Sequence, residues 1–197
     1  MTKLILLLFS MTLFSCGQKG AGETAAPITE VKKASTTTAP SFNADSAYAY
    51  VEKQVSFGYR VPNTSAHKAC GDYLVSELKR FGAQVYEQEA TLKAYDGTPL
   101  ESRNIIGSFN PDKDKRILLF AHWDTRPYSD HDPDPAYHKK PLDGADDGAS
   151  GVGALLEIAR QMGMKAPEVG VDIIFFDAED YGTPEFAKDR YNDTSDT

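Results

Sequence analysis

The sequence has little cysteine, no excess of positive charge and no long hydrophobic run, and each shortage excludes a class of protein. Two cysteines in 197 residues exclude a scaffold built on disulfides. A formal net charge of −8 argues against nucleic acid as the main partner, because phosphate binding needs a basic surface. The apolar stretch at residues 4–15 is too short to span a bilayer. The remaining composition, 41% hydrophobic and 25% charged, is that of a globular protein.

The amino end resembles a bacterial lipoprotein signal. A positive start at Lys3 precedes the apolar stretch, and the small Ser15 stands directly before Cys16, as such signals require. We expect residues 1–15 to be removed, Cys16 to be lipidated, and the protein to be exported to the periplasm and tethered to a membrane by its lipid anchor alone. Plain cleavage near Ser15 and a buried amino-terminal element are the alternatives. Residues 16–41 are rich in Gly, Ala, Thr and Pro and are predicted to be a flexible linker.

Residues 42–197 are predicted to form the folded domain, in which helical and strand-like patterns alternate. Asp45 or Ser46 can cap a first helix, and Thr64 or Ser65 a second. The patterns predict helices at residues 45–56, 65–81 and 149–162, and strands at residues 84–94, 102–109, 117–121 and 171–176.

The last two strands and the helix between them set the fold class. Ile117–Ala121 is a continuous apolar run, which is typical of a strand buried on both faces. Because a helix separates it from Val171–Phe176, the two strands are expected to be parallel, with a right-handed crossover. The sequence therefore predicts an α/β fold: a mixed sheet with a parallel centre and an antiparallel edge pair, and helices on both faces.

Acidic residues gather where these strands end. Residues 124–197 carry a net charge of −10, and three clusters stand at residues 122–124, 143–148 and 177–180. Ligands of open α/β sheets bind beyond the carboxyl ends of the strands, so the clusters are expected to share one rim. Such crowded carboxylates favour a bound cation, and His with Asp or Glu suits Zn²⁺. For any one cluster alone, helix capping by Asp146 or Asp147, or simple solvation, is the competing interpretation.

The same segments resemble a known family. Three stretches carry the likeness: Ile117–Pro127, Leu142–Glu157 and Ile173–Gly182. The second contains the run Gly-Ala-Asp-Asp-Gly-Ala-Ser-Gly-Val, and the third contains Phe-Phe-Asp-Ala-Glu-Asp. They are similar to the zinc-dependent M28 aminopeptidases, and most of all to the glutaminyl-peptide cyclotransferase branch, over roughly Asp45–Asp196. The resemblance implies a phosphorylase/hydrolase-like fold of the zinc exopeptidase type.

The resemblance also implies roles for five residues. Asp147 matches the central metal ligand and Asp180 a second carboxylate ligand, where the family often has Glu. Glu179 matches the general acid and base. His122 matches a ligand of the second zinc in two-metal aminopeptidases, and it is not a ligand in cyclases that bind one zinc. The competing interpretation of His122 is a polar strand-end residue paired with Asp124. Asp124 is expected to orient His122.

This pattern is compatible with two enzymatic functions and with one function that is not enzymatic. A glutaminyl-peptide cyclotransferase would convert the amino-terminal Gln of peptides to pyroglutamate and release ammonia; Trp123, Thr125-Arg126-Pro127 and residues 177–182 favour this zinc-dependent acyltransferase. A zinc aminopeptidase would use the same residues to hydrolyse amino-terminal residues. The third interpretation is a tethered binding domain with an incomplete metal site. The oligomeric state stays open.

The family pattern requires a further Asp and a final His ligand after Asp180. The other histidines are His67, expected on the surface of a helix, and His131 and His138, expected in a solvated loop with ordinary solvated acids such as Asp130. The domain is therefore expected to be truncated at its carboxyl end. On this basis the 197 residues alone would bind zinc weakly and lack activity.

Overall fold

The structure is a computed structural model that describes residues 40–191. The signal at residues 1–15, the lipidation of Cys16 and nearly all of the linker lie outside these residues and stay predictions. The elements, in chain order, are α1 (Ala44–Val55), α2 (Ser65–Arg80), β1 (Gln84–Lys93), β2 (Pro99–Phe109), β3 (Arg116–His122), a 3₁₀ turn (Pro135–Tyr137), α3 (Ala149–Met164), β4 (Gly170–Phe176), a second 3₁₀ turn (Glu185–Ala187) and α4 (Lys188–Tyr191).

Side-chain caps determine where the first two helices begin. The Asn43 side chain accepts a hydrogen bond from the Ser46 amide at 3.0 Å, so the predicted cap at Asp45 or Ser46 was wrong by two or three residues. Thr64 caps α2 as predicted, accepting from the His67 amide at 3.1 Å. Asn and Thr are both favoured caps because their oxygens satisfy amides that have no partner within the helix.

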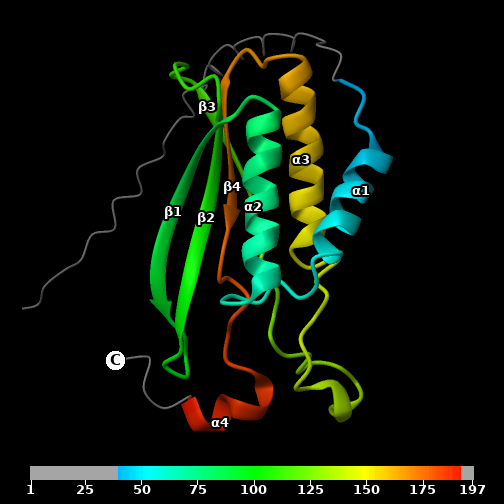
Figure 1. The fold of residues 1–197 in the computed structure, drawn as a ribbon, viewed down its shortest axis with the longest axis vertical. Coiled ribbons are helices and arrows are strands. Elements are labelled where there is room, and N and C mark those ends of the chain that lie inside the picture. Colours follow the sequence, from blue (N-terminus) through cyan, green and yellow to red (C-terminus); the bar gives the residue numbers. More distant parts are fainter. Residues whose placement is uncertain (1–39, 192–197) are drawn as a thin grey trace, which may run out of the picture. The chain divides into compact units, whose positions relative to one another are not determined.

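The four strands form one sheet in the order β1-β2-β4-β3 (Figure 1). β1 pairs antiparallel with β2, and β2 with β4. β3 and β4 are parallel, with His122 opposite Phe176 at their carboxyl ends, and α3 forms the crossover between them. The predicted antiparallel pair and βαβ unit are confirmed. The parallel pair, however, lies at the β3 edge of the sheet formed by residues 40–191 rather than at its centre.

The hydrophobic core lies between one face of the sheet and the helices. Leu74 and Leu78 of α2, Val152 and Leu156 of α3, and Ile173 of β4 are fully buried in it. α1 packs on α3 and lies beside it in Figure 1.

The opposite face of the sheet has no helix on it within residues 40–191 (Figure 1). The prediction that β3 is buried on both faces was wrong for this reason: Leu118 and Phe120, which face away from the core, are 53% and 65% exposed. An apolar run reports that a strand can be buried, but not which neighbours cover it. No helix in this part of the chain is both long enough and apolar enough to cross a membrane.

Candidate active site

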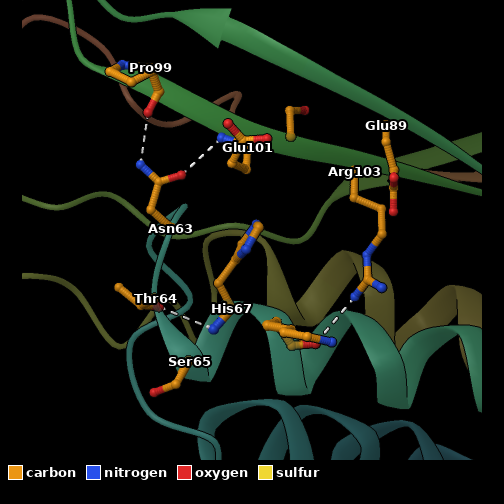
Figure 2. A pocket seen from close by; sticks show the side chains of 10 residues that line it. Asn63, Thr64, Ser65, His67, Glu89, Pro99, Glu101 and Arg103 are labelled. Carbon is orange, nitrogen blue, oxygen red and sulfur yellow. Dashed lines mark hydrogen bonds between the residues drawn. The ribbon is translucent and has the colours of Figure 1, made fainter.

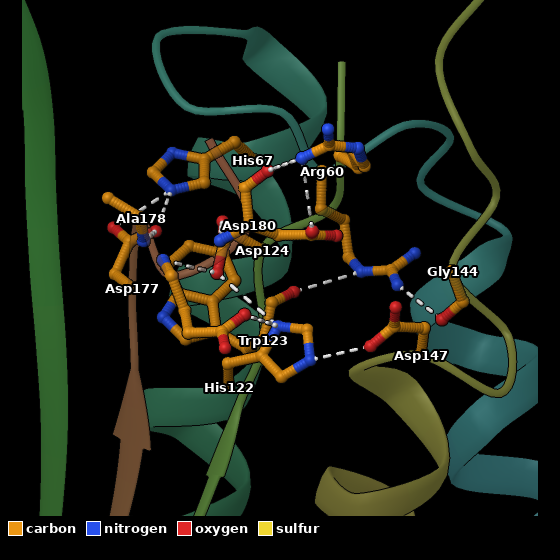
Figure 3. A network of polar contacts seen from close by, with 12 residues as sticks. Arg60, His67, His122, Trp123, Asp124, Gly144, Asp147, Asp177, Ala178 and Asp180 are labelled. Atoms are coloured by element: carbon orange, nitrogen blue, oxygen red, sulfur yellow. Dashed lines mark hydrogen bonds and ion pairs between the residues drawn. The ribbon is translucent and has the colours of Figure 1, made fainter. Parts of the chain in front are cut away.

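Three segments meet at the carboxyl ends of the parallel strands, as predicted (Figure 3). His122 ends β3, Asp147 lies just before α3, and residues 177–180 follow β4. The His122 Nε2 atom lies 2.9 Å from the Asp147 Oδ1 atom. The Glu179 carboxylate lies 3.8 Å from His122 Nδ1. The imidazole of one acidic cluster therefore contacts carboxylates from the other two clusters that the sequence placed at this rim.

The start of α3 leaves Asp147 free to face the rim. Gly148 is the N-cap, and no side chain caps this helix, so the capping interpretation of Asp146 and Asp147 was wrong. Gly148 has φ +91°, a conformation that suits glycine. A Cβ atom there would lie 3.1 Å from both the His122 Cε1 atom and the Asp124 carbonyl oxygen. Glycine thus permits the close approach of the helix to β3.

Asp124 has a contact that the sequence did not predict. Its buried carboxylate accepts hydrogen bonds from the backbone amides of Glu179 at 3.2 Å and Asp180 at 3.1 Å. The distance from Asp124 to His122 Nδ1 is 3.5 Å, which is an ion-pair contact. Asp124 therefore fixes the backbone of the loop that carries Glu179 and Asp180, besides facing His122.

The carboxylates at the rim crowd one another. Burial, and then the charges of Asp147 and Asp124, raise the pKa of Asp180 to about 6. Asp124 first, and then Asp147 and Glu179, raise the pKa of His122 to about 9. Burial is the largest cause for Asp180, whereas for His122 burial opposes the shift and the neighbouring carboxylates outweigh it. The negative charge concentrated at the rim contributes to both shifts, because it favours any positive charge there.

The donors present suit zinc in kind, because this metal binds imidazole and carboxylate groups. A bound cation would also relieve the repulsion from Asp147 and Asp124 that adds to burial in raising the pKa of Asp180. Within residues 40–191, however, no three His, Cys, Asp or Glu side chains are gathered as a metal cluster. This part of the chain thus supplies a pair of candidate ligands, Asp147 and Asp180, rather than an enclosed site.

A buried arginine braces the loop before α3. Arg60 is fully buried and donates hydrogen bonds to the carbonyl oxygens of Trp123 at 3.1 Å, Asp143 at 2.9 Å and Gly144 at 2.8 Å (Figure 3). The loop on which Asp147 stands is thereby tied to the end of β3. Nothing in the local pattern of the sequence indicated this role.

Two polar residues expected on the surface are buried. His67 is 5% exposed, and its Nε2 atom lies 2.8 Å from Asp177 Oδ1. Asp130 is 4% exposed and pairs with Arg126 through two hydrogen bonds of 2.7 and 2.8 Å. Their partners are distant or lie in an irregular loop, so helical spacing and loop composition gave no sign of them. His131 is exposed, as expected.

Comparison with known proteins gives a consistent family. Residues 104–195 match the model of peptidase family M28. The chain resembles the crystal structure of a Zn-dependent exopeptidase from Parabacteroides distasonis, with 80% identity and a TM-score of 0.74, over 75% of this chain and 50% of that one. For a glutaminyl cyclase from Tannerella forsythia the identity is 69% and the TM-score 0.74, with the same coverage.

The chain resembles the M28 family over residues 104–195. A third similar structure, a leucine aminopeptidase precursor from Bacteroides thetaiotaomicron, is 64% identical with a TM-score of 0.74, over 75% of this chain and 51% of that one. The predicted family and the zinc exopeptidase fold are thus confirmed. The chain spans about half the length of these solved relatives.

Proposed function

We propose that the protein carrying this sequence is a glutaminyl-peptide cyclotransferase, acting on peptides and proteins that begin with Gln. The observation that carries the proposal is the placement of Glu179 beside His122, on a loop whose backbone Asp124 fixes. The 69% identity to a protein named as a glutaminyl cyclase supports the choice of reaction.

Asp147 and Asp180 are proposed to hold a catalytic zinc. Bound there, zinc would supply Lewis-acid polarisation of the substrate carbonyl. The raised pKa of Asp180 supports this assignment, since its carboxylate lies among like charges that a cation would neutralise. One ion suffices for the cyclase; a second, at His122, belongs to the aminopeptidase alternative.

Glu179 is proposed to move the proton. Its side chain is 62% exposed at the rim, where a substrate amine can reach it. The substrate's α-amine nitrogen bonds to its own side-chain amide carbon, and the carbon–nitrogen bond of that amide breaks. Glu179 accepts the proton from the amine and gives it to the departing ammonia. Because the attack is intramolecular, holding the two groups of the substrate in line contributes much of the acceleration.

An M28 aminopeptidase is the second candidate. The relatives named as a Zn-dependent exopeptidase and a leucine aminopeptidase precursor favour it. Here water replaces the amine as nucleophile, and Glu179 takes its proton. The same side chains serve both reactions, so their positions do not separate them.

The deciding experiment compares two products from the zinc-loaded protein that carries this sequence. Ammonia release from a Gln-initiated peptide is expected, without release of free amino acid from an aminoacyl anilide. Amino acid release without ammonia would establish the aminopeptidase instead. Release of neither product would favour a binding domain.

The amino end supports a proposal about location. We infer that the protein is exported and held at a membrane in the periplasm through lipid on Cys16, on the grounds of the short apolar stretch that precedes this residue. Labelling with a radioactive fatty acid tests the inference. The unsubstituted protein (the parent) should take up label, and the Cys16→Ala variant should not. Equal labelling of the two would contradict the inference.

A further inference from the structure

His67 connects the helical layer to the candidate active site. It lies in the first turns of α2, and Figure 2 shows its ring directed from the helix toward β2. The ring lines one side of a hollow of about 670 Å³ that also contacts Lys68 and Arg103 but none of the rim carboxylates. On its other side His67 meets Asp177, the first residue after β4 (Figure 3). His67 thus contacts both this hollow and the first residue of the loop that carries Glu179.

The Asp177 carboxylate depends on His67 for its side-chain donor. Its Oδ1 and Oδ2 atoms lie 2.8 and 2.9 Å from His67 Nε2. Its other hydrogen bonds come from backbone amides, those of Arg103 at 2.7 Å and Ala178 at 2.8 Å. The Asp177 side chain is fully buried, and a buried carboxylate that loses a donor is strongly destabilised. Loss of the His67 donor would therefore leave the buried Asp177 carboxylate with the two backbone amides alone and weaken its hold.

The position of Asp177 matters because the next residue is strained. Ala178 has φ +60°, the left-handed conformation, which costs a residue with a side chain about 1–2 kcal/mol. Two carboxylates hold the backbone on either side of it: Asp177 accepts from the Ala178 amide, and Asp124 accepts from those of Glu179 and Asp180. The turn at Ala178 is thus clamped before and after, and it sets where Glu179 points.

The His67 ring makes two contacts, and different substitutions can remove one contact while keeping the other. It stacks on the buried Trp123 ring, with centroids 4.3 Å apart and planes 15° from parallel, and it donates to Asp177. A phenyl ring can keep the stack but has no donor. A glutamine amide keeps a donor at similar reach but loses the aromatic stack.

We propose that His67 is a positioning residue for the rim: through its hydrogen bond to Asp177 it holds the strained turn that presents Glu179 and Asp180. The role rests on the proposed function for its catalytic consequence, but the placement of Asp180 as a metal ligand can be measured separately. His67 touches neither substrate nor metal in this scheme.

The test compares His67→Phe with His67→Gln in the zinc-loaded protein. His67→Phe should lower kcat about 10–100-fold with little change in KM, and should weaken zinc binding by a similar factor, as removal of groups that orient metal ligands usually does. His67→Gln should restore both to within about threefold of the parent. Cys70→Ala, one turn further along α2 and equally buried, is the matched control, since it loosens the same helix without contacting Asp177. It should lower the melting temperature but leave kcat and zinc affinity unchanged.

Three outcomes decide the proposal. Loss in the Phe variant with rescue by Gln supports it. A Phe variant that keeps parental kcat and zinc affinity overturns it, as does a Cys70→Ala variant that loses as much of both. If the unsubstituted protein releases no ammonia, zinc affinity alone tests the positioning role. It is measured by competition with a chromogenic chelator. Failure of the proposed function is then distinguished from failure of the positioning role.

Discussion

Gly148 holds a position at the rim that no other residue can take without strain. Its φ is +91°, and an added Cβ would press on His122 and Asp124 at 3.1 Å. Gly82, at φ +87°, has nothing within 4 Å of that position. We predict that Gly82→Ala costs about 1 kcal/mol of unfolding free energy from strain alone, and that Gly148→Ala costs about 1–3 kcal/mol more from overpacking. Urea denaturation of both variants checks this; equal losses would show that contact with β3 is unimportant.

Glu179 is expected to act in chemistry and not in metal binding. Glu179→Gln keeps the size of the side chain but cannot accept the substrate proton, so turnover should fall about 10²–10⁴-fold. The zinc dissociation constant should stay at the parental value. Steady-state ammonia release and a zinc titration measure the two effects. Glu168→Gln is the control, because Glu168 is exposed and precedes the amino end of β4, whereas the rim lies at the carboxyl end of that strand. Equal loss of activity in this variant would remove the case for Glu179.

Single residues of the rim differ in how far their surroundings could be predicted. Asp147 directly precedes the predicted helix at residues 149–162, and Glu179 follows the predicted strand at residues 171–176. Their positions at the rim therefore followed from the predicted topology. His67 has a partner 110 residues away, and one histidine on a helix does not reveal such a partner. Asp124 was correctly placed at the rim, but its hydrogen bonds to the 179–180 backbone depend on exact loop geometry that no pattern encodes.

At the scale of elements, Arg60 holds the loop before α3 in place. Arg60→Met would remove donors from three carbonyl oxygens. We expect a loss of about 3 kcal/mol in unfolding free energy and faster amide exchange over residues 143–149. Arg80→Met, which loses an exposed pair with Glu77, should cost less than about 1 kcal/mol. Hydrogen exchange that is unchanged at the loop would show that Arg60 stabilises the fold without bracing it.

The junction of α1 and α3 carries a pH dependence. The buried Glu157 carboxylate accepts from Arg160, Gln161 and the Asn43 amide, and these donors, Arg160 first, lower its pKa to about 2. A carboxyl with a lowered folded pKa stabilises above its ordinary pKa of about 4.3, and the stabilisation fades as the pH falls toward about 2.

Melting temperatures between pH 6 and pH 2 test this junction. The parent should exceed Glu157→Gln most at pH 6, and the two curves should converge as the pH approaches about 2. A gap that stays constant over this range would mean that Glu157 acts through packing and not through its charge.

Elements were predicted well where their signals are local, and poorly where they depend on neighbours. α2 was expected at residues 65–81 and runs over Ser65–Arg80, because its cap and its apolar spacing lie within one segment. β3 was also found in place, but its burial was misjudged. Burial of a strand depends on what packs against it, and the apolar run alone cannot specify that.

At the scale of the whole molecule, the sheet face that no helix covers within residues 40–191 and the β3 edge favour association. Phe120 is 65% exposed there, and an apolar edge strand offers a template for association. We predict concentration-dependent self-association of the 197-residue chain that Phe120→Lys reduces. Tyr48→Lys on α1, where the tyrosine is also 65% exposed, should have little effect. Light scattering over a dilution series measures both, and equal reduction by the two variants would contradict a role for the edge.

The parallel pairing of β3 with β4 also determines when the rim can exist. Asp124 meets the amides of Glu179 and Asp180 across 55 and 56 residues of chain, and the whole crossover through α3 must be in place before they touch. Closing so long a segment is entropically costly, and contacts of this span form late in folding. A folding intermediate containing α2, β1 and β2 would therefore carry no acidic rim. Acquisition of activity during refolding should then coincide with the last structural phase and not with the first.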